Sequence, residues 1–91
     1  MPRKNETERR IDIGAIDIGA IDDAVLALLS LTLDRDGRAW KGFDWDVLDR
    51  LYQKGLIGNP VGKAKSVVLT DEGIARSRAL FERLFMRDGK T

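Results

Sequence analysis

The chain has 91 residues, of which 43% are hydrophobic and 34% are charged, and these values predict one small globular domain with a single modest core. It contains no cysteine and no histidine, which excludes disulfides, thiolate nucleophiles, zinc fingers, iron–sulfur clusters and every mechanism that uses an imidazole. The net charge of +1 and the isoelectric point near 8.1 lie well below the strongly basic balance of a dedicated nucleic-acid binder.

The first 21 residues predict a flexible arm ahead of the folded domain. Residues 1–10 are polar and lack apolar periodicity, and the pentapeptide IDIGA then occurs twice, at 11–15 and 16–20. Two copies are too few for a repeat solenoid, so we favour a tandem duplication that lengthens the lead into the first helix. The alternative is a pair of short strand-like units, with isoleucines alternating with aspartates, that pair with a sheet edge or a second subunit.

A first helix is expected from Asp22 or Asp23 to Leu33, because aspartates suit a helix start and the following leucines leave little polar face. Its nearly apolar run, Ala24–Leu33, is half the roughly 20 residues that a bilayer span needs. We therefore expect the central core helix and no membrane contact. The N-terminus shows no export signal, and a cytoplasmic location is the simplest expectation.

A second helix is predicted from its N-cap Asp44 through Lys54, with Gly55 as the left-handed stop. Turn signals follow at residues 58–62. Ser66–Leu69 is typical of a strand whose alternate residues face the core. Together these features predict a small β-hairpin after the second helix.

A third helix is predicted from its N-cap Thr70 to about Arg87, and a short tail follows at 88–91. Its apolar stripe is broad and includes Phe81 and Phe85. A stripe of this width at the end of a short domain exceeds what one monomer can cover. We therefore expect a homodimer through this helix, with both phenylalanines as candidates for protein contact.

Two short motifs, in this order, resemble the winged helix-turn-helix family. They are the turn KGLI at Lys54–Ile57 and the helix start LTDEG at Leu69–Gly73, and the match covers about residues 43–85. The chain also resembles a small bacterial family of unknown function that carries an RAWKGFDWDVLDRL-type stretch, here Arg38–Leu51.

The winged-helix resemblance implies a three-helix core in which the helix of residues 45–54 faces a DNA groove and a wing at Gly62–Lys65 touches backbone phosphate. The sequence departs from that pattern in two ways. Between Leu33 and Phe43 there is scarcely room for the scaffold helix. The groove-facing helix also exposes carboxylates, which are a poor electrostatic match for phosphate: Asp44, Asp46 and Asp49.

Basic side chains on the second helix and on the hairpin are the candidates for nucleic-acid contact. They are Arg50, Lys54, Lys63 and Lys65. Lys63 and Lys65 are two apart on the hairpin and can project to one side, but two lysines neutralise only about two phosphates. We therefore expect weak binding to duplex DNA. The competing interpretation is that these lysines protect a hairpin edge from aggregation.

Four of the six aromatic residues lie within thirteen positions, namely Trp40, Phe43, Trp45 and Tyr52. We favour a small aromatic core beneath the second helix. A stacking platform for a base and a protein-contact patch are the alternatives. Trp45 lies away from the apolar side of its helix and is the best candidate for an exposed protein contact.

Asp46 and Asp49 share one helix face and could approach a divalent ion. No further ligand is identifiable, however, and Arg50 and Lys54 are placed to pair with them. Neither glycine-rich segment has the lysine and hydroxyl of a phosphate loop. We therefore expect no catalytic residue, no metal site and no cofactor, and hence a protein that is not an enzyme.

The sequence as a whole predicts a mainly α protein with a small β-hairpin, organised as a winged-helix-like three-helix core with a shortened scaffold helix. This domain occupies residues 22–87 and follows the arm at 1–21. Two functions remain open at this point. One is a small noncatalytic regulatory or accessory protein with weak DNA binding. The other is a protein-interaction module that keeps the fold without binding DNA and uses Trp45 and the acidic helix face.

Overall fold

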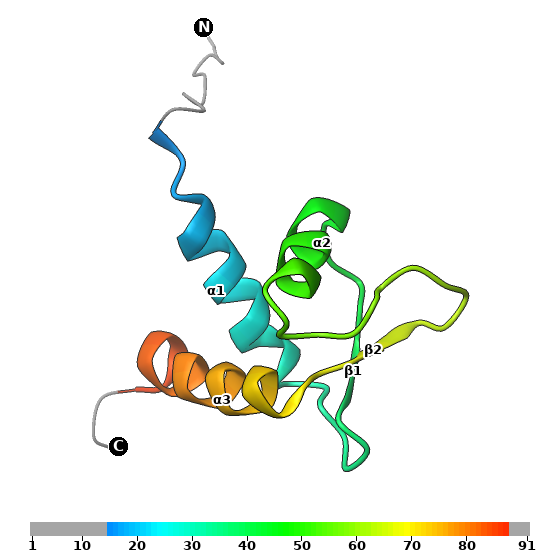
Figure 1. Cartoon of the computed structure of the whole chain (residues 1–91). Helices are drawn as coiled ribbons and strands as arrows, with labels where there is room; N and C mark the ends of the chain where they lie inside the picture. The colour runs from blue at the N-terminus through cyan, green and yellow to red at the C-terminus, as the bar shows by residue number, and fades with distance from the viewer. Residues whose placement is uncertain (1–14, 88–91) are drawn as a thin grey trace, which may run out of the picture.

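The computed structural model describes residues 15–87, which contain three helices and two strands joined by loops (Figure 1). In chain order they are α1 (Ile18–Leu29), β1 (Arg38–Trp40), α2 (Trp45–Gln53), β2 (Ser66–Val68) and α3 (Asp71–Phe85). The expected class, mainly α with a small antiparallel β element, is confirmed. Residues 1–14, which hold most of the predicted arm, and the tail at 88–91 lie outside the described residues.

The first helix lies about one turn earlier than the sequence predicts. It begins after Asp17, whose carboxylate accepts a hydrogen bond from the Ala20 amide at 3.0 Å. Asp22 is therefore inside the helix, and the predicted end at Leu33 lies beyond it. The second IDIGA copy, residues 16–20, contributes its last three residues to α1, which begins at Ile18. This agrees with a duplication that lengthens the lead into the helix and contradicts a strand-like unit at residues 16–20.

The second helix forms where its capping signals predict. The Asp44 carboxylate accepts hydrogen bonds from the amides of Asp46 at 3.1 Å and Val47 at 3.3 Å. Gly55 follows the helix with a φ of 76°, the left-handed conformation that glycine tolerates best. Only residues 41–44 separate β1 from α2, so the described chain has no scaffold helix at this point.

The sheet pairs a strand that the sequence analysis missed with one that it predicted. β1 runs antiparallel to β2, with Ala39 opposite Val67. The predicted hairpin is reduced to a single bridge between Ile57 and Leu69, and the intervening loop projects from the fold (Figure 1). The alternation predicted for the second strand is confirmed, because Val67 and Leu69 are buried whereas Val68 is 41% exposed.

The third helix is held against the rest of the domain by a close approach and a buried hydrogen bond. The Thr70 hydroxyl caps it by accepting from the Gly73 amide at 3.0 Å. A Cβ at Gly73 would collide with the Leu56 carbonyl oxygen, so this crossing requires glycine. The buried Ser77 hydroxyl donates to the Leu26 carbonyl at 2.6 Å and ties α3 to α1.

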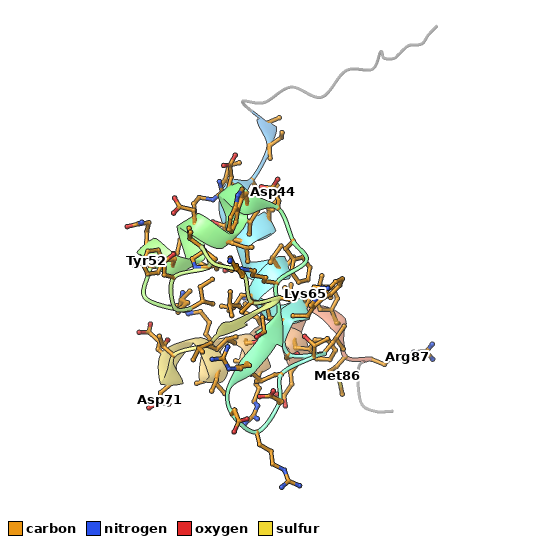
Figure 2. All side chains as sticks on the ribbon, turned by 90° about the vertical axis from the view of Figure 1, so that its right-hand side faces the viewer. Asp44, Tyr52, Lys65, Asp71, Met86 and Arg87 are labelled. Carbon is orange, nitrogen blue, oxygen red and sulfur yellow. The ribbon has the colours of Figure 1, made fainter. Side chains whose placement is uncertain are left out.

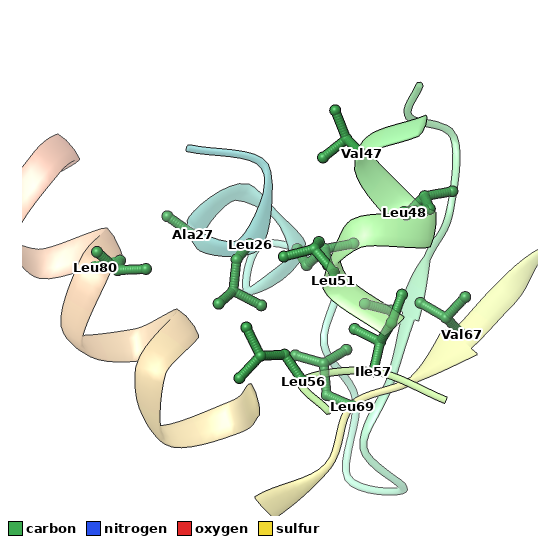
Figure 3. Close-up of a cluster of buried hydrophobic side chains, with 12 residues drawn as sticks. Leu26, Ala27, Val47, Leu48, Leu51, Leu56, Ile57, Val67, Leu69 and Leu80 are labelled. Carbon is green, nitrogen blue, oxygen red and sulfur yellow. The ribbon is translucent and has the colours of Figure 1, made fainter. Parts of the chain in front are cut away.

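The core lies where the three helices and the inner face of the sheet meet (Figure 3). Its buried side chains come from every helix, from both strands and from the segment after α2. They are Leu26, Ala27, Leu29, Ala39, Val47, Leu48, Leu51, Leu56, Ile57, Val67, Leu69 and Leu80. Among the described residues, no helix is both long enough and apolar enough to cross a bilayer.

Candidate functional site

Arg50 of α2 and Lys54, the C-cap that follows this helix, bind a buried carboxylate on α1. Asp22 is only 1% exposed, and its two carboxylate oxygens accept from Arg50 Nε at 3.0 and 2.9 Å. Arg50 Nη2 adds a third hydrogen bond at 2.8 Å, and Lys54 Nζ donates at 3.1 Å. This Asp22 cluster satisfies a buried charge and joins the two helices.

The hydrogen bonds within the Asp22 cluster shift the pKa values of its members. Donation by Arg50 holds the pKa of Asp22 below its ordinary value, although burial acts in the opposite direction, and Asp22 in turn raises the pKa of Arg50. Asp22 therefore remains ionised. The prediction that Arg50 and Lys54 pair with Asp46 and Asp49 is wrong, because the bases turn toward α1.

The outward side of α2 carries carboxylates around an exposed indole. Trp45 is 54% exposed, which confirms the predicted exposure, and a hollow of about 240 Å³ opens beside it. The hollow is lined by Trp45, Asp46, Asp49, Pro60 and Val61, which we call the Trp45 face. Asp46 and Asp49 form no ion pair with any other described residue. Within residues 15–87, no group of three or more acidic side chains is arranged to hold a metal ion.

A lysine before α2 braces the loop that forms the other wall of the Trp45 face. Lys41 Nζ donates to the carbonyl oxygens of Pro60 at 2.6 Å and Gly62 at 3.1 Å. The same amine lies 5.8 Å from the ring centroid of Trp45, within the range of a cation–π contact. The Lys41 amide also donates to the Lys65 carbonyl at 3.0 Å. One residue thus holds both the loop and the indole in place.

The two loop lysines line a different hollow from that of the Trp45 face. Lys63 and Lys65 are exposed and line a second hollow of about 380 Å³ beside Trp40. Lys65 is labelled near the middle of the view in Figure 2. The four predicted nucleic-acid contacts therefore divide into two groups: Arg50 and Lys54 bind Asp22, whereas the loop lysines remain at the surface.

The predicted aromatic core beneath α2 is wrong for most of its members. Trp40 is 58% exposed and Tyr52 is 38% exposed, and of the four aromatic residues only Phe43 packs against the core. The inner face of α2 consists of aliphatic side chains, so Tyr52 and Trp45 lie on its other sides, whereas Trp40 lies on the outer face of β1. The exposed indoles of Trp40 and Trp45 instead mark the two hollows.

The C-terminal end of α3 carries Phe81 and Phe85, the two side chains predicted from the sequence to contact a protein partner. Phe81 is partly buried against the core and makes a tilted ring contact with Phe85, with 5.7 Å between ring centroids. Phe85 is 45% exposed, and its neighbours Leu84 and Met86 are 44% and 58% exposed. The label of Met86 in Figure 2 marks this end of the helix. The end of the stripe thus extends beyond the monomer core.

Comparison with known proteins assigns the chain to one family. A family model described as "Domain of unknown function (DUF6429)" matches residues 17–87. The chain belongs to this family. The DUF6429 segment begins at the N-cap of α1 and ends just beyond α3, so it contains the Asp22 cluster and both hollows.

A bacterial relative supports the same assignment. The chain is 64% identical over 72 residues to "Uncharacterized protein y4hR" of Sinorhizobium fredii (strain NBRC 101917 / NGR234), an alignment that covers 79% of this chain and 97% of the relative. No solved structure matches the chain. These findings agree with the resemblance of Arg38–Leu51 to a small bacterial family of unknown function. Neither description specifies an activity for DUF6429.

Proposed function

We propose that this DUF6429 protein is a noncatalytic accessory protein that docks on a protein partner through the Trp45 face. The observation that carries the proposal is the charge distribution of α2 and its C-cap. Arg50 and the C-cap Lys54 bind Asp22, whereas Asp46 and Asp49 are exposed. A helix oriented this way presents negative charge to an approaching phosphate backbone. The same arrangement suits a protein surface that carries basic residues.

The composition of the Trp45 face supports protein contact. Tryptophan is enriched at the energetic centres of protein interfaces because it combines a large apolar area with few rotatable bonds. Trp45 is 54% exposed and Val61 is 73% exposed, and the carboxylates of Asp46 and Asp49 lie at the rim. Because Lys41 braces both the loop and the indole, the face needs little ordering when a partner binds.

We propose further that the domain is a reduced winged helix. Three features support this: a strand precedes α2, a loop separates the Ile57 bridge from β2, and a capped helix follows. In a helix-turn-helix, the helix before the recognition helix crosses the DNA backbone. The described chain has only residues 41–44 at that place. This reduction favours a domain that keeps the architecture without reading a groove.

Site-specific crosslinking tests the proposed docking surface. A photoreactive amino acid replaces Val61 at the edge of the Trp45 face, and a second preparation carries it at Arg78, which is exposed on α3. Both proteins are irradiated in cells of the organism that encodes the chain. We expect a distinct protein adduct from position 61 that is missing from position 78.

Variants of the Trp45 face make this test specific. Trp45→Ala and Asp46→Asn/Asp49→Asn should each remove the adduct at position 61, because they delete the apolar anchor and the charged rim. The matched control Asp36→Asn/Glu82→Gln removes two exposed carboxylates elsewhere and should leave the adduct unchanged. Circular dichroism confirms that each variant is folded. An adduct that persists in both face variants would refute the proposal.

A further inference from the structure

A second hollow lies beside Trp40 and differs in charge from the Trp45 face. It measures about 380 Å³ and is lined by Trp40, Lys41, Gly42, Gly62, Lys63, Ala64 and Lys65. None of these residues is acidic, although the chain as a whole contains almost equal numbers of acidic and basic side chains. The hollow therefore combines an indole, three lysines and three small residues, so that a ligand can approach the backbone closely.

The indole of Trp40 lies at the edge of the sheet and against Gly42. Trp40 follows the buried Ala39 on β1, and neighbouring residues of a strand point to opposite faces. The Trp40 side chain therefore lies on the outer face of the sheet and is 58% exposed. The Trp40 amide donates to the Thr32 hydroxyl at 2.9 Å. A Cβ at Gly42 would lie 2.8 Å from the six-membered ring, so the indole rests against the chain at a place where only glycine leaves room.

Three lysines line the same hollow as the exposed indole of Trp40. Lys63 and Lys65 are exposed, whereas the Lys41 amine is bound to loop carbonyls and serves as a brace. Arg38 shares the outer face of β1 with Trp40, and its Nη1 donates to the Ser66 hydroxyl, which is uncharged. Arg38, Lys63 and Lys65 thus form no ion pair with a described carboxylate.

We propose that this hollow binds single-stranded nucleic acid, with one base stacked on Trp40 and the adjoining phosphates at Lys63 and Lys65. Stacking needs the flat face of an unpaired base, which a duplex keeps inside its helix. A lysine pair beside an aromatic ring is the combination that sequence-tolerant single-strand binders use. The two hollows have different lining residues, although Lys41 of this hollow also contacts Trp45 and bonds Pro60 of the Trp45 face.

Fluorescence titration with short oligonucleotides tests the stacking contact directly. The chain has two tryptophans, so Trp45→Phe leaves Trp40 as the sole indole reporter. Octathymidylate and octauridylate are added at low salt, and a hairpin duplex serves as the third probe. We expect saturable quenching of Trp40 by one or both single strands, with their ratio distinguishing DNA from RNA. The duplex should bind at least about tenfold more weakly, because its bases are already stacked.

Anisotropy of a labelled oligonucleotide separates the contributions of stacking and charge. Trp40→Leu should weaken binding by about tenfold or more. Lys63→Ala/Lys65→Ala should reduce the salt-dependence slope by about 1.4, since each phosphate contact to a single strand contributes about 0.7. Gly42→Ala changes no charge but displaces the indole, so it should weaken binding and reduce the quenching of Trp40.

A charge-matched variant provides the control for nonspecific attraction. Arg78→Ala/Arg83→Ala removes two exposed cations from α3 and should leave affinity and slope near the wild-type values. Circular dichroism establishes that each variant is folded before it is titrated. The inference is overturned if no single strand quenches Trp40, if the duplex binds as tightly as the single strands, or if the loop-lysine and α3 variants have equal effects.

Discussion

The Asp22 cluster gives a quantitative prediction about the stability of the fold. In the native state Asp22 is 1% exposed and accepts hydrogen bonds from Arg50 and Lys54. Arg50→Gln leaves a buried carboxylate whose remaining partner among residues 15–87 is the Lys54 amine. Breaking a fully buried ion pair costs about 3–5 kcal/mol. Because the Arg50 side chain is 35% exposed, we expect a smaller loss of about 2–3 kcal/mol in the free energy of unfolding.

The companion variant and the double variant complete the cycle. Asp22→Asn leaves two cations that can turn toward water, so its expected cost is about 1–2 kcal/mol. The double variant should cost less than the sum of the single variants, with a coupling energy of about 1–2 kcal/mol between Asp22 and Arg50. Urea denaturation followed by far-ultraviolet circular dichroism measures all four proteins, and equal m-values confirm a common transition.

A surface ion pair supplies the control for this cycle. Arg76 and Glu72 are one helical turn apart on α3, with 3.7 Å between charged atoms, and both side chains are more than half exposed. Arg76→Gln should therefore change stability by less than about 0.5 kcal/mol. If Arg50→Gln costs no more than Arg76→Gln, or if the Asp22 and Arg50 variants are strictly additive, the bases of α2 are not committed to the fold and the reasoning fails.

Three further predictions concern helix packing, acid stability and assembly. Gly73→Ala should lower the free energy of unfolding by about 2 kcal/mol or more, because its methyl group would push Leu56 out of the core. Gly55→Ala meets open space and should cost about 1 kcal/mol, for the positive φ alone. Equal costs would contradict the close approach at Gly73. Folding lowers the pKa of Asp22, so the ionised carboxylate stabilises the fold at pH values above its unfolded-state pKa of about 3.9, and this stabilisation is lost as the pH falls through the folded-state pKa. The denaturation midpoints of wild type and Asp22→Asn should therefore converge on acidification, and a constant difference would refute this prediction. Light scattering should detect a dimer that Phe85→Glu disrupts, and a wild-type monomer at high concentration would exclude assembly through α3.

The parts of the fold that short-range signals determine could be predicted from the sequence. Asp44 and Thr70 were identified as N-caps because a capping side chain bonds amides two or three residues away. Gly55 was identified as the stop of α2 because a helix C-terminus favours a left-handed residue. The exposure of Trp45 followed from the helical period, which opposes it to the apolar side of α2.

The features that depend on contacts distant in the sequence could not be predicted. Asp22 lies 28 residues from Arg50 in the sequence, and its position near the start of a predicted helix is typical of a helix cap. The packing of α1 on α2 instead places its carboxylate opposite the two bases. β1 was missed because only one of its three residues, Ala39, is buried, and its pairing with β2 is nonlocal. Two adjacent carboxylates, Asp22 and Asp23, inside an otherwise apolar helix were the available signal for the cluster. Which of them is buried, and what it binds, depends on the fold.

The central claim is that Arg50 and Lys54 bind the buried Asp22 while the carboxylates of α2 face outward. The ionisation of Asp22 tests this claim most directly. Heteronuclear NMR of the folded protein during an acid titration reports the pKa of the Asp22 side-chain carboxyl. We predict a pKa below the ordinary aspartate value, because hydrogen bonds from Arg50 outweigh the effect of burial. A pKa at or above the ordinary value would show that the bases do not hold this carboxylate, and it would contradict the account.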